Sequence, residues 1–368
     1  MKAIVMKRRE FVASLSAAGA LLATGNGLAS HAAGKEKESV AGVSELITPK
    51  TRSSINKGLK FLAKRQINDG KYKGAFGKAG YASGVAVTSL AGMAFMCSGS
   101  TPVDGKYSSN VRRCVEFVLR NVRESGYIAL RNETYSSNMY GHGYAMLFLT
   151  QAYGMGMQSN DQIKKKLGKA IEMTCGIQNH EGGWRYQPVK QDADLSITVC
   201  QVMALRAAHS AGFEVSDEVR EKTMKYVEKC QNKDGSFNYT ARGGRQSVAL
   251  AAAGIVSYYS AGVYEGERIE KGLKWIFDRG PGKSNRQTVS PMNYFYAHYY
   301  AVQAMWHAQI QKPSYWNSWF PAIRDELLDQ KMAPDGTWHD AKVGSEFATA
   351  MACIILQIPY NYLPVFSP

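Results

Sequence analysis

The chain has 368 residues, of which 45% are hydrophobic and 20% are charged, and its formal net charge is +15 at pH 7. This composition is typical of a folded globular protein and excludes the disordered and fibrous classes. The basic charge favours anionic partners, including an anionic membrane surface. The sequence lacks the arginine-rich run with interleaved aromatic residues that would indicate binding to nucleic acid.

The N-terminal segment predicts export. Arg8 and Arg9 precede an apolar stretch of small residues from Ala13 to Ala23. Paired arginines before a mildly hydrophobic stretch resemble a twin-arginine export signal, and an ordinary secretory signal is the alternative. We therefore expect residues 1–33 to be a cleaved signal and residues 34–48 to be a polar linker. The mature protein should then be soluble, in the periplasm or another extracytoplasmic place.

Residues 49–368 fall into blocks of about 50 residues, a period typical of repeat proteins. Each block has an amphipathic helix bearing Lys and Glu, a Gly-rich turn and a nearly uncharged helix. The first block reads Lys57-Gly58-x-x-Phe61-Leu62-x-x-x-Gln66, then a turn at Gly70-Lys71-Tyr72. Apolar helices are expected at about residues 81–97, 195–208, 247–259 and 347–356, one in each of four blocks.

The repeated residue types have structural explanations. A lysine and an aromatic residue four positions later share one helical face. The glutamine at the helix end can satisfy unpaired backbone groups, and the glycines permit a tight turn. The aromatic residue after the glycines, such as Trp184, is expected to be buried against the neighbouring repeat.

This pattern resembles the repeat motif of squalene-hopene and oxidosqualene cyclases, the prenyltransferase/squalene oxidase repeat, and the superfamily also contains protein prenyltransferase β-subunits. The resemblance covers residues 50–358. It implies an all-α fold, an α6/α6 toroid of six helical hairpins whose inner helices line an apolar funnel. Independently, alternating charged and uncharged helices suit two layers, because a helix that is apolar all round must be buried on every side.

In such a toroid, polar residues just ahead of the inner helices converge on one mouth. The catalytic candidates are Asp194, Asp192 and His142, and the ligand-binding candidates are Tyr140, Tyr144, Arg245, Tyr294, Tyr296, His298 and Glu346. Asp192-Ala193-Asp194-Leu195 resembles the Asp-x-Asp-Asp acid of class II terpene cyclases, which would make Asp194 the acid, although Leu195 replaces the last aspartate. The alternative is that Asp194 caps the following helix.

His142 lies between two glycines and is either a general base or a structural histidine. No metal site and no cofactor are expected. The zinc histidine of prenyltransferases falls opposite Ala297, and their Asp-x-Cys ligands have no counterpart in the fourth block. The six cysteines, which lie mostly among apolar neighbours and form no Cys-x-x-Cys pattern, are expected to be free thiols.

Three functions remain open. The first is binding of an apolar, isoprenoid or lipid-like ligand in the barrel by an exported, squalene-cyclase-like repeat protein. The second is a cyclase-like enzyme with Asp194 as its acid, although one toroid is only half of a triterpene cyclase. The third is a carbohydrate-active enzyme that uses Asp194 and Glu346 as paired carboxylates.

Overall fold

The computed structural model describes residues 39–77, 84–130, 138–283, 289 and 293–367. The predicted export signal and the first part of the expected linker lie outside the described residues. From Ser39 onward the chain forms one unit. Within the expected linker, Val43–Leu46 forms the short helix α2, the side chains of Leu46 and Ile47 are buried, and the amide of Ala41 donates to Oδ1 of Asn317 at 2.9 Å.

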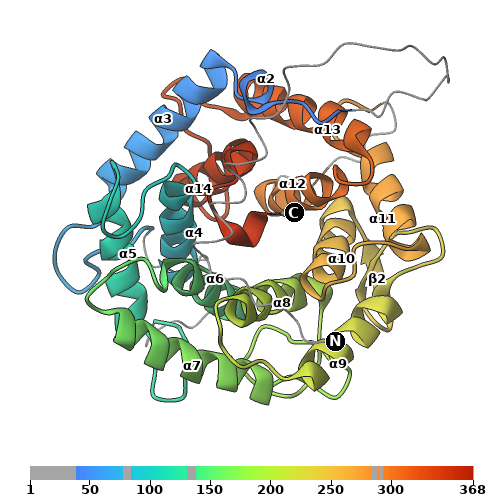
Figure 1. Ribbon diagram of the computed structural model, residues 1–368, viewed down its shortest axis with the longest axis horizontal. Helices are drawn as coiled ribbons and strands as arrows, with labels where there is room; N and C mark the ends of the chain where they lie inside the picture. The colour runs from blue at the N-terminus through green and yellow to red at the C-terminus, as the bar shows by residue number, and fades with distance from the viewer. Residues whose placement is uncertain (1–38, 78–83, 131–137, 284–288, 290–292, 368) are drawn as a thin grey trace, which may run out of the picture. The chain divides into compact units, whose positions relative to one another are not determined.

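The described residues form two concentric rings of helices, as the sequence predicts (Figure 1). The outer helices are α3 (Pro49–Arg65), α5 (Ser108–Arg120), α7 (Asn160–Gly176), α9 (Asp217–Cys230), α11 (Glu267–Asp278) and α13 (Pro313–Glu326). The inner helices are α4 (Gly84–Met96), α6 (Asn138–Ala152), α8 (Leu195–Ser210), α10 (Val248–Ser260), α12 (Tyr294–Ala308) and α14 (Ser345–Gln357). Each inner helix packs against the next, and α14 closes the ring against α4.

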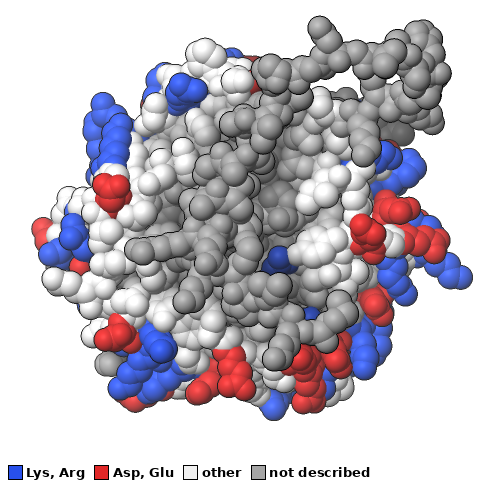
Figure 2. Space-filling model, viewed as in Figure 1, with Lys and Arg blue, Asp and Glu red and all other residues white. Residues whose placement is uncertain are grey.

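Polarity explains which helices lie inside. In α5, Val111, Cys114 and Val118 are buried, while Glu116 and Arg120 are exposed. This one-sided pattern covers an inner layer and leaves the charges in water. By contrast, α4 is buried on all sides from Val87 to Met96. Charged side chains accordingly gather around the circumference, over the outer helices (Figure 2).

The turn glycines join successive repeats. Gly182 has a φ of +100°, and a Cβ built on it would lie 2.1 Å from the carbonyl oxygen of Lys222 in the next outer helix. Gly126 meets the carbonyl of Lys169 in the same way, also at 2.1 Å. Only glycine permits both this backbone conformation and this approach. The glycine of one repeat and the lysine of the next are therefore two sides of one junction.

The repeated glutamines stabilise the same junctions. Nε2 of Gln178 donates to the carbonyl of Gly182 in its own turn and to that of Val219 in α9, both at 2.9 Å. Nε2 of Gln66 likewise reaches a turn carbonyl and a carbonyl of α5. We expected the glutamine to act at its own helix end, but its partners are the turn and the next outer helix.

The turn of the first block lies four residues later than predicted. A Cβ on Gly74 would lie 2.3 Å from the carbonyl oxygen of Arg113, whereas one on Gly70 would meet nothing within 4 Å. Phe76, and not the exposed Tyr72, takes the place that Trp184 has in the third block. Both residues are buried as wedges between helices, and Trp184 donates from Nε1 to the carbonyl of Thr174 at 2.8 Å.

The smaller elements include an antiparallel hairpin between α9 and α10, where the sequence predicted only a turn. It consists of β1 (Asn238–Thr240) and β2 (Gly243–Gln246). A π-helical turn, η2 (Leu327–Lys331), follows α13, and the chain ends with η3 (Ile358–Tyr360) and η4 (Pro364–Phe366). In the described part of the chain, no helix combines the length and apolarity needed to cross a membrane. All six cysteines are free thiols.

Candidate functional site at the mouth of the barrel

Three inner helices, α6, α8 and α12, bring side chains from their first turns together. The hydroxyl of Tyr140 donates to Oγ of Ser196 at 2.7 Å, and the hydroxyl of Tyr296 donates to the carbonyl of Ser196 at 2.9 Å. The rings of Tyr140 and Tyr296 meet edge to face with their centroids 6.0 Å apart. We call Tyr140, Asp194, Ser196 and Tyr296 the mouth cluster.

Asp194 caps α8 from within this cluster. Its Oδ1 accepts from the amide of Ile197 at 2.9 Å and from Oγ of Ser196 at 2.5 Å. The residue is fully buried, and its Oδ2 lies 3.8 Å from Nε of Arg185. Burial raises the pKa of Asp194, and its hydrogen bonds with Ser196, Ile197 and Tyr239 and the charge of Arg185 only partly oppose this rise. Asp194 is therefore both a helix cap and a carboxyl group that holds its proton more tightly than usual.

Asp192, the other aspartate of the motif, forms an ion pair with Arg185 and is about half exposed. Asp192 thus holds the guanidinium that faces Asp194. The hydroxyls of Tyr186 and Tyr239 are hydrogen-bonded to each other, and Tyr239 also interacts with Asp194. These neighbours join the β1–β2 hairpin to the aspartate.

Aromatic residues continue the site into the barrel. The hydroxyl of Tyr300 lies 3.3 Å from that of Tyr144 and 3.1 Å from Sγ of Cys200. All three side chains are buried, and burial raises the pKa of both tyrosines well above the usual value, so their hydroxyls stay neutral. The rings of Tyr144 and Tyr299 meet edge to face at 6.0 Å. The interior next to Asp194 is thus aromatic and uncharged.

The arrangement has a simple periodicity. Each of the three helices contributes a pair four residues apart, namely Tyr140 and Tyr144, Ser196 and Cys200, and Tyr296 and Tyr300. Residues i and i+4 lie on one helical face. This spacing is the sequence signal that would have identified Ser196, Cys200 and Tyr300. Arg185, Tyr186 and Tyr239 come from loops and a hairpin, where no periodicity points to them.

Two ligand-binding candidates lie elsewhere. Tyr294 donates from its hydroxyl to Oε1 of Glu326 at 2.9 Å, and the His298 ring packs 6.0 Å from that of Trp319. Glu326 and Trp319 belong to the outer helix α13. The expectation that Tyr294 and His298 line the mouth is therefore corrected: they fill the space between α12 and α13.

His142 also faces the outer layer. Its Nδ1 accepts from the amide of Ile128 at 3.1 Å, so the proton is on Nε2, which lies 2.8 Å from Oγ1 of Thr174. Burial lowers the pKa of His142 to about 3. In three other blocks a threonine takes this position. Thr88 accepts from the amide of Phe76, Thr198 from that of Trp184, and Thr349 from that of Trp338. These contacts favour the structural reading of His142 over the general base.

The remaining candidates lie at the edge of the site or away from it. Arg245, on β2, is exposed and lies 5.5 Å over the ring of Tyr239. Glu346 lies in the first turn of α14 and pairs with Arg65 of α3 at 2.8 Å. Going round the inner ring, α4 and α6 separate α14 from α8, the helix that Asp194 caps (Figure 1).

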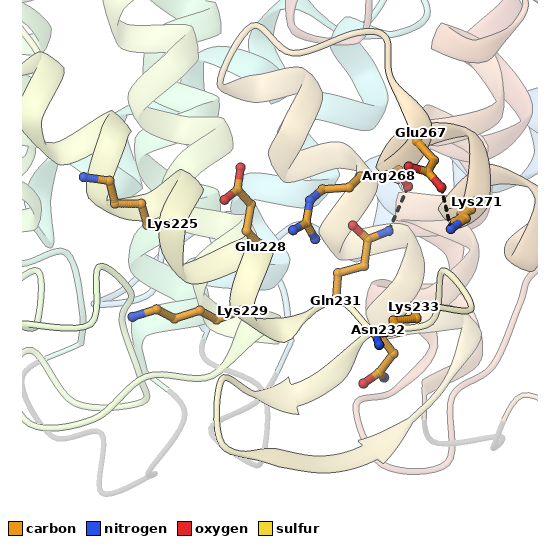
Figure 3. Close-up of a pocket in the computed structure, with 9 residues that line it drawn as sticks. All are labelled: Lys225, Glu228, Lys229, Gln231, Asn232, Lys233, Glu267, Arg268 and Lys271. Atoms are coloured by element: carbon orange, nitrogen blue, oxygen red, sulfur yellow. Dashed lines mark hydrogen bonds and ion pairs between the residues drawn. The ribbon is translucent and has the colours of Figure 1, made fainter.

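A charged groove of about 650 Å³ lies on the outside, between α9 and α11. Figure 3 shows Gln231 donating to the carbonyl of Arg268 at 2.8 Å, and Lys271 paired with Glu267 at 2.7 Å. This groove is the outer side of a repeat junction, and these partners lie within the chain itself. Among the described residues, no three His, Cys, Asp or Glu side chains gather as metal ligands would.

Known structures share this architecture. The type II terpene cyclase MstE from Scytonema, in a variant holding its substrate geranylgeranyl dihydroxybenzoate, is 15% identical over 87% of this chain and 100% of that one, with a TM-score of 0.57. The cellobiose 2-epimerase from Bacillus thermoamylovorans B4167 is 12% identical over 85% and 98%, with a TM-score of 0.59. The GH76 α-mannanase BT2949 from Bacteroides thetaiotaomicron is 10% identical over 85% and 96%, with a TM-score of 0.60.

At these identities the likeness shows the fold alone, which terpene cyclases and carbohydrate-active enzymes share. No curated protein matches the chain by sequence. The family model of the prenyltransferase alpha-alpha toroid domain matches residues 110–279, which run from α5 through α11. This match covers a little less than half of the chain and agrees with the resemblance drawn from the repeat pattern, and the described helices before and after it complete the ring.

Proposed function

We propose that the protein binds an apolar ligand with one polar end, isoprenoid or lipid-like, in the barrel. The polar end would lie at Asp194 and the apolar part against the tyrosines of α6 and α12. The observation that carries this proposal is a fully buried carboxyl group with a raised pKa beside an uncharged aromatic interior. Burial favours the protonated form of this carboxyl group, and that form would donate a hydrogen bond to an oxygen of the ligand without bringing an unpaired charge into the barrel.

Acid catalysis is the second candidate, because the same carboxyl group can also give up its proton. Oγ of Ser196 connects Asp194 to the hydroxyl of Tyr140, so a proton lost by Asp194 has a route for replacement. Aromatic faces stabilise a cation that forms when an alkene is protonated. MstE, which shares the fold, is by name a type II terpene cyclase, and its structure holds geranylgeranyl dihydroxybenzoate as substrate.

The carbohydrate-active alternative has weaker support. Paired carboxylates of glycosidases stand about 5 to 10 Å apart. Asp194 caps α8, whereas Glu346 lies in the first turn of α14, with two inner helices in between, and forms an ion pair with Arg65. Because an epimerase and a mannanase share the fold, the experiment below also looks for a bound sugar.

Native mass spectrometry with solvent extraction of the purified protein tests the proposal. We expect a polyprenyl or other lipid-like molecule to be released, and added geranylgeraniol to bind to the emptied protein. A bound oligosaccharide would favour the carbohydrate class. Failure to bind any prenyl alcohol or lipid would contradict the proposal.

We also propose that the protein is exported through its paired arginines, Arg8 and Arg9. Replacing both with lysine keeps the charge but removes the guanidinium groups, and should stop export. Fractionation of cells with an antibody against the mature protein measures this. Unchanged export would point to the general secretory route.

A further inference from the structure

A second cavity, of about 210 Å³, lies where α8, α9 and α10 meet. These three helices are neighbours in the two rings (Figure 1). Arg206, one turn before the end of α8, lines this cavity. It follows Asp194 by twelve residues, about 18 Å along the helix. The cavity is therefore at the end of α8 opposite the mouth cluster and is separate from the candidate site there.

The lining of this cavity combines apolar and charged side chains. Its apolar part includes Val202 and Leu205 of α8 and Val219 of α9. Sites of this kind hold ligands with an apolar body and few polar groups. Because 210 Å³ is less than the roughly 300 to 1,000 Å³ of sites for drug-sized ligands, the ligand should be small.

Arg206 gives the cavity a positive charge. Among the described residues of the six inner helices, it is the only lysine or arginine. The other arginine of the lining, Arg220, pairs with Asp217 at 2.9 Å, whereas Arg206 forms no ion pair within the described part of the chain. Burial, and then the charge of Arg206, lower the pKa of His307 to about 4. The charge of Arg206 is thus left without a carboxylate to balance it.

Capping of α10 explains only part of this arrangement. Nη1 of Arg206 donates to the carbonyl of Tyr259 in the last turn of α10, where a cation is favourable. The guanidinium also lies 5.6 Å from the centroid of the Tyr264 ring. These two contacts fix its direction. A guanidinium has five N–H donors, however, and the bond to Tyr259 uses one of them.

We propose that this cavity binds a small amphipathic carboxylate of the fatty-acid type. Its carboxylate would accept from Arg206, whose planar fork matches two carboxylate oxygens. Its hydrocarbon part would lie against Val202, Leu205 and Val219 and be removed from water there. This inference does not rest on the proposed function, because the cavity is separate from the mouth cluster.

Isothermal titration calorimetry with octanoate tests the site. We expect one molecule to bind per chain, with a dissociation constant below about 1 mM for a ligand of this size. Arg206→Gln should weaken this binding at least about tenfold, because charge-assisted hydrogen bonds are lost. The matched control Arg112→Gln removes an exposed arginine of α5, outside the cavity, and should leave the affinity unchanged. No binding to the wild type, or equal affinity in a folded Arg206→Gln, would overturn the proposal.

A second variant tests the cavity without changing any charge. Val219→Phe fills the space beside Arg206 and should also weaken octanoate binding at least about tenfold, since the hydrocarbon part then has no room. Val103→Phe adds the same volume at an exposed position outside the lining and should bind octanoate like the wild type. Circular dichroism checks that each variant is folded. Full octanoate affinity in a folded Val219→Phe would contradict the assignment to this cavity.

The mouth cluster is separated from this site by two further measurements. Arg206→Gln should bind geranylgeraniol like the wild type, because Arg206 is far from Asp194. Octanoate binding that Asp194→Asn weakens and Arg206→Gln leaves intact would place octanoate at the mouth and overturn the proposal. Absence of geranylgeraniol binding to either protein would contradict the proposed function alone, and the octanoate titrations would still decide this inference.

Discussion

Asp194 combines two roles that are usually considered alternatives. As the cap of α8 it accepts the amide of Ile197, and as a buried carboxyl group it has a raised pKa. Burial causes both properties, because it excludes the water that would otherwise solvate the helix end and the carboxylate. Capping alone therefore does not argue against acid chemistry.

Two substitutions separate these roles. Asp194→Asn keeps an oxygen for the Ile197 amide, and asparagine caps about as well as aspartate, so the free energy of unfolding should hardly change. Asp194→Ala removes the cap and should lower that free energy by about 0.5 to 2 kcal/mol. Urea unfolding at neutral pH measures both.

Ligand measurements complete this test. Because the amide of asparagine can still donate a hydrogen bond, Asp194→Asn should bind geranylgeraniol nearly as well as the wild type. If an activity is identified and a well-folded Asp194→Asn has lost it, Asp194 is an acid and the cyclase-like function takes first place.

The sequence indicated which residues begin the inner helices better than it indicated the direction in which each side chain points. Asp194 and Tyr140 could be identified because polar residues at the starts of the apolar helices gather at one end of the barrel. In α12, however, Tyr294 and His298 were grouped with Tyr296. Two residues along a helix correspond to a rotation of about 200°. Tyr296 and Tyr300 therefore face inward, while Tyr294 and His298 face α13.

At the scale of the elements, the junctions between repeats depend on glycine. Gly182→Ala should be strongly destabilising for two reasons. The new Cβ would lie 2.1 Å from a backbone carbonyl oxygen of α9, and the alanine would have to adopt a positive φ. Gly212 has a similar φ of +89° but open space around it. Gly212→Ala should lower the free energy of unfolding only by the cost of a positive φ in alanine, about 1 to 2 kcal/mol, and Gly182→Ala should lower it clearly more.

Denaturant unfolding of the two glycine variants gives the comparison. The difference between them isolates the close approach from the backbone conformation. Equal losses of stability would mean that α9 moves away at no cost, and the junction would then not be a rigid contact.

The wedge between helices gives a second test at this scale. Trp184→Ala should lower the free energy of unfolding by about 3 to 5 kcal/mol, the range for emptying a large aromatic site. Trp184→Phe keeps most of the ring but loses the hydrogen bond to the carbonyl of Thr174, and should cost less. A loss near zero for alanine, in the same unfolding experiment, would contradict the wedge.

The sequence predicted the helices but not all of the segments between them. The spacing of Lys57, Phe61 and Gln66 located the first outer helix, since helical periodicity is strong over a dozen residues. The following turn was misplaced because Gly70 and Gly74 are locally similar, and only contact with Arg113 distinguishes them. The β1–β2 hairpin has no apolar alternation, and its pairing depends on its place between α9 and α10.

The contact between the sixth and the first repeat, which closes the ring, resembles the junctions between successive repeats. A Cβ on Gly336, in the last turn, would lie 2.8 Å from Cδ of Lys57 in the first outer helix, and one on Gly58 would lie 2.7 Å from Sγ of Cys353. The sixth repeat thus meets the first much as the third meets the fourth. Closure removes both exposed ends that an open array of repeats would have.

Two histidines with a lowered pKa, His142 and His307, make the stability of the ring depend on pH. Burial lowers the pKa of His142 from 6.5 to about 3 and that of His307 from 6.5 to about 4. Below pH 6.5 the unfolded chain therefore binds protons that the folded chain does not, so stability falls as the pH falls. Well inside this window each histidine should contribute about 1.4 kcal/mol per pH unit.

Asp194 has the opposite sign. Because its pKa is raised in the fold, its stabilising contribution is fully present below the unfolded value of 3.8 and is lost as the pH rises through the folded value. Between these two pKa values Asp194 therefore makes stability fall as the pH rises, which partly opposes the effect of the histidines.

Urea unfolding at a series of pH values between 4 and 6.5, the range set by His307 and the unfolded histidine, measures the balance. Stability should increase with pH across this range. His142→Asn should reduce the slope by about one histidine's contribution, about 1.4 kcal/mol per pH unit. A slope unaffected by His142→Asn would contradict this prediction, because it would mean that His142 takes up its proton in the folded ring. A protonated imidazole can no longer accept a hydrogen bond from the Ile128 amide, so the contacts of His142 with Ile128 and Thr174 would have to rearrange.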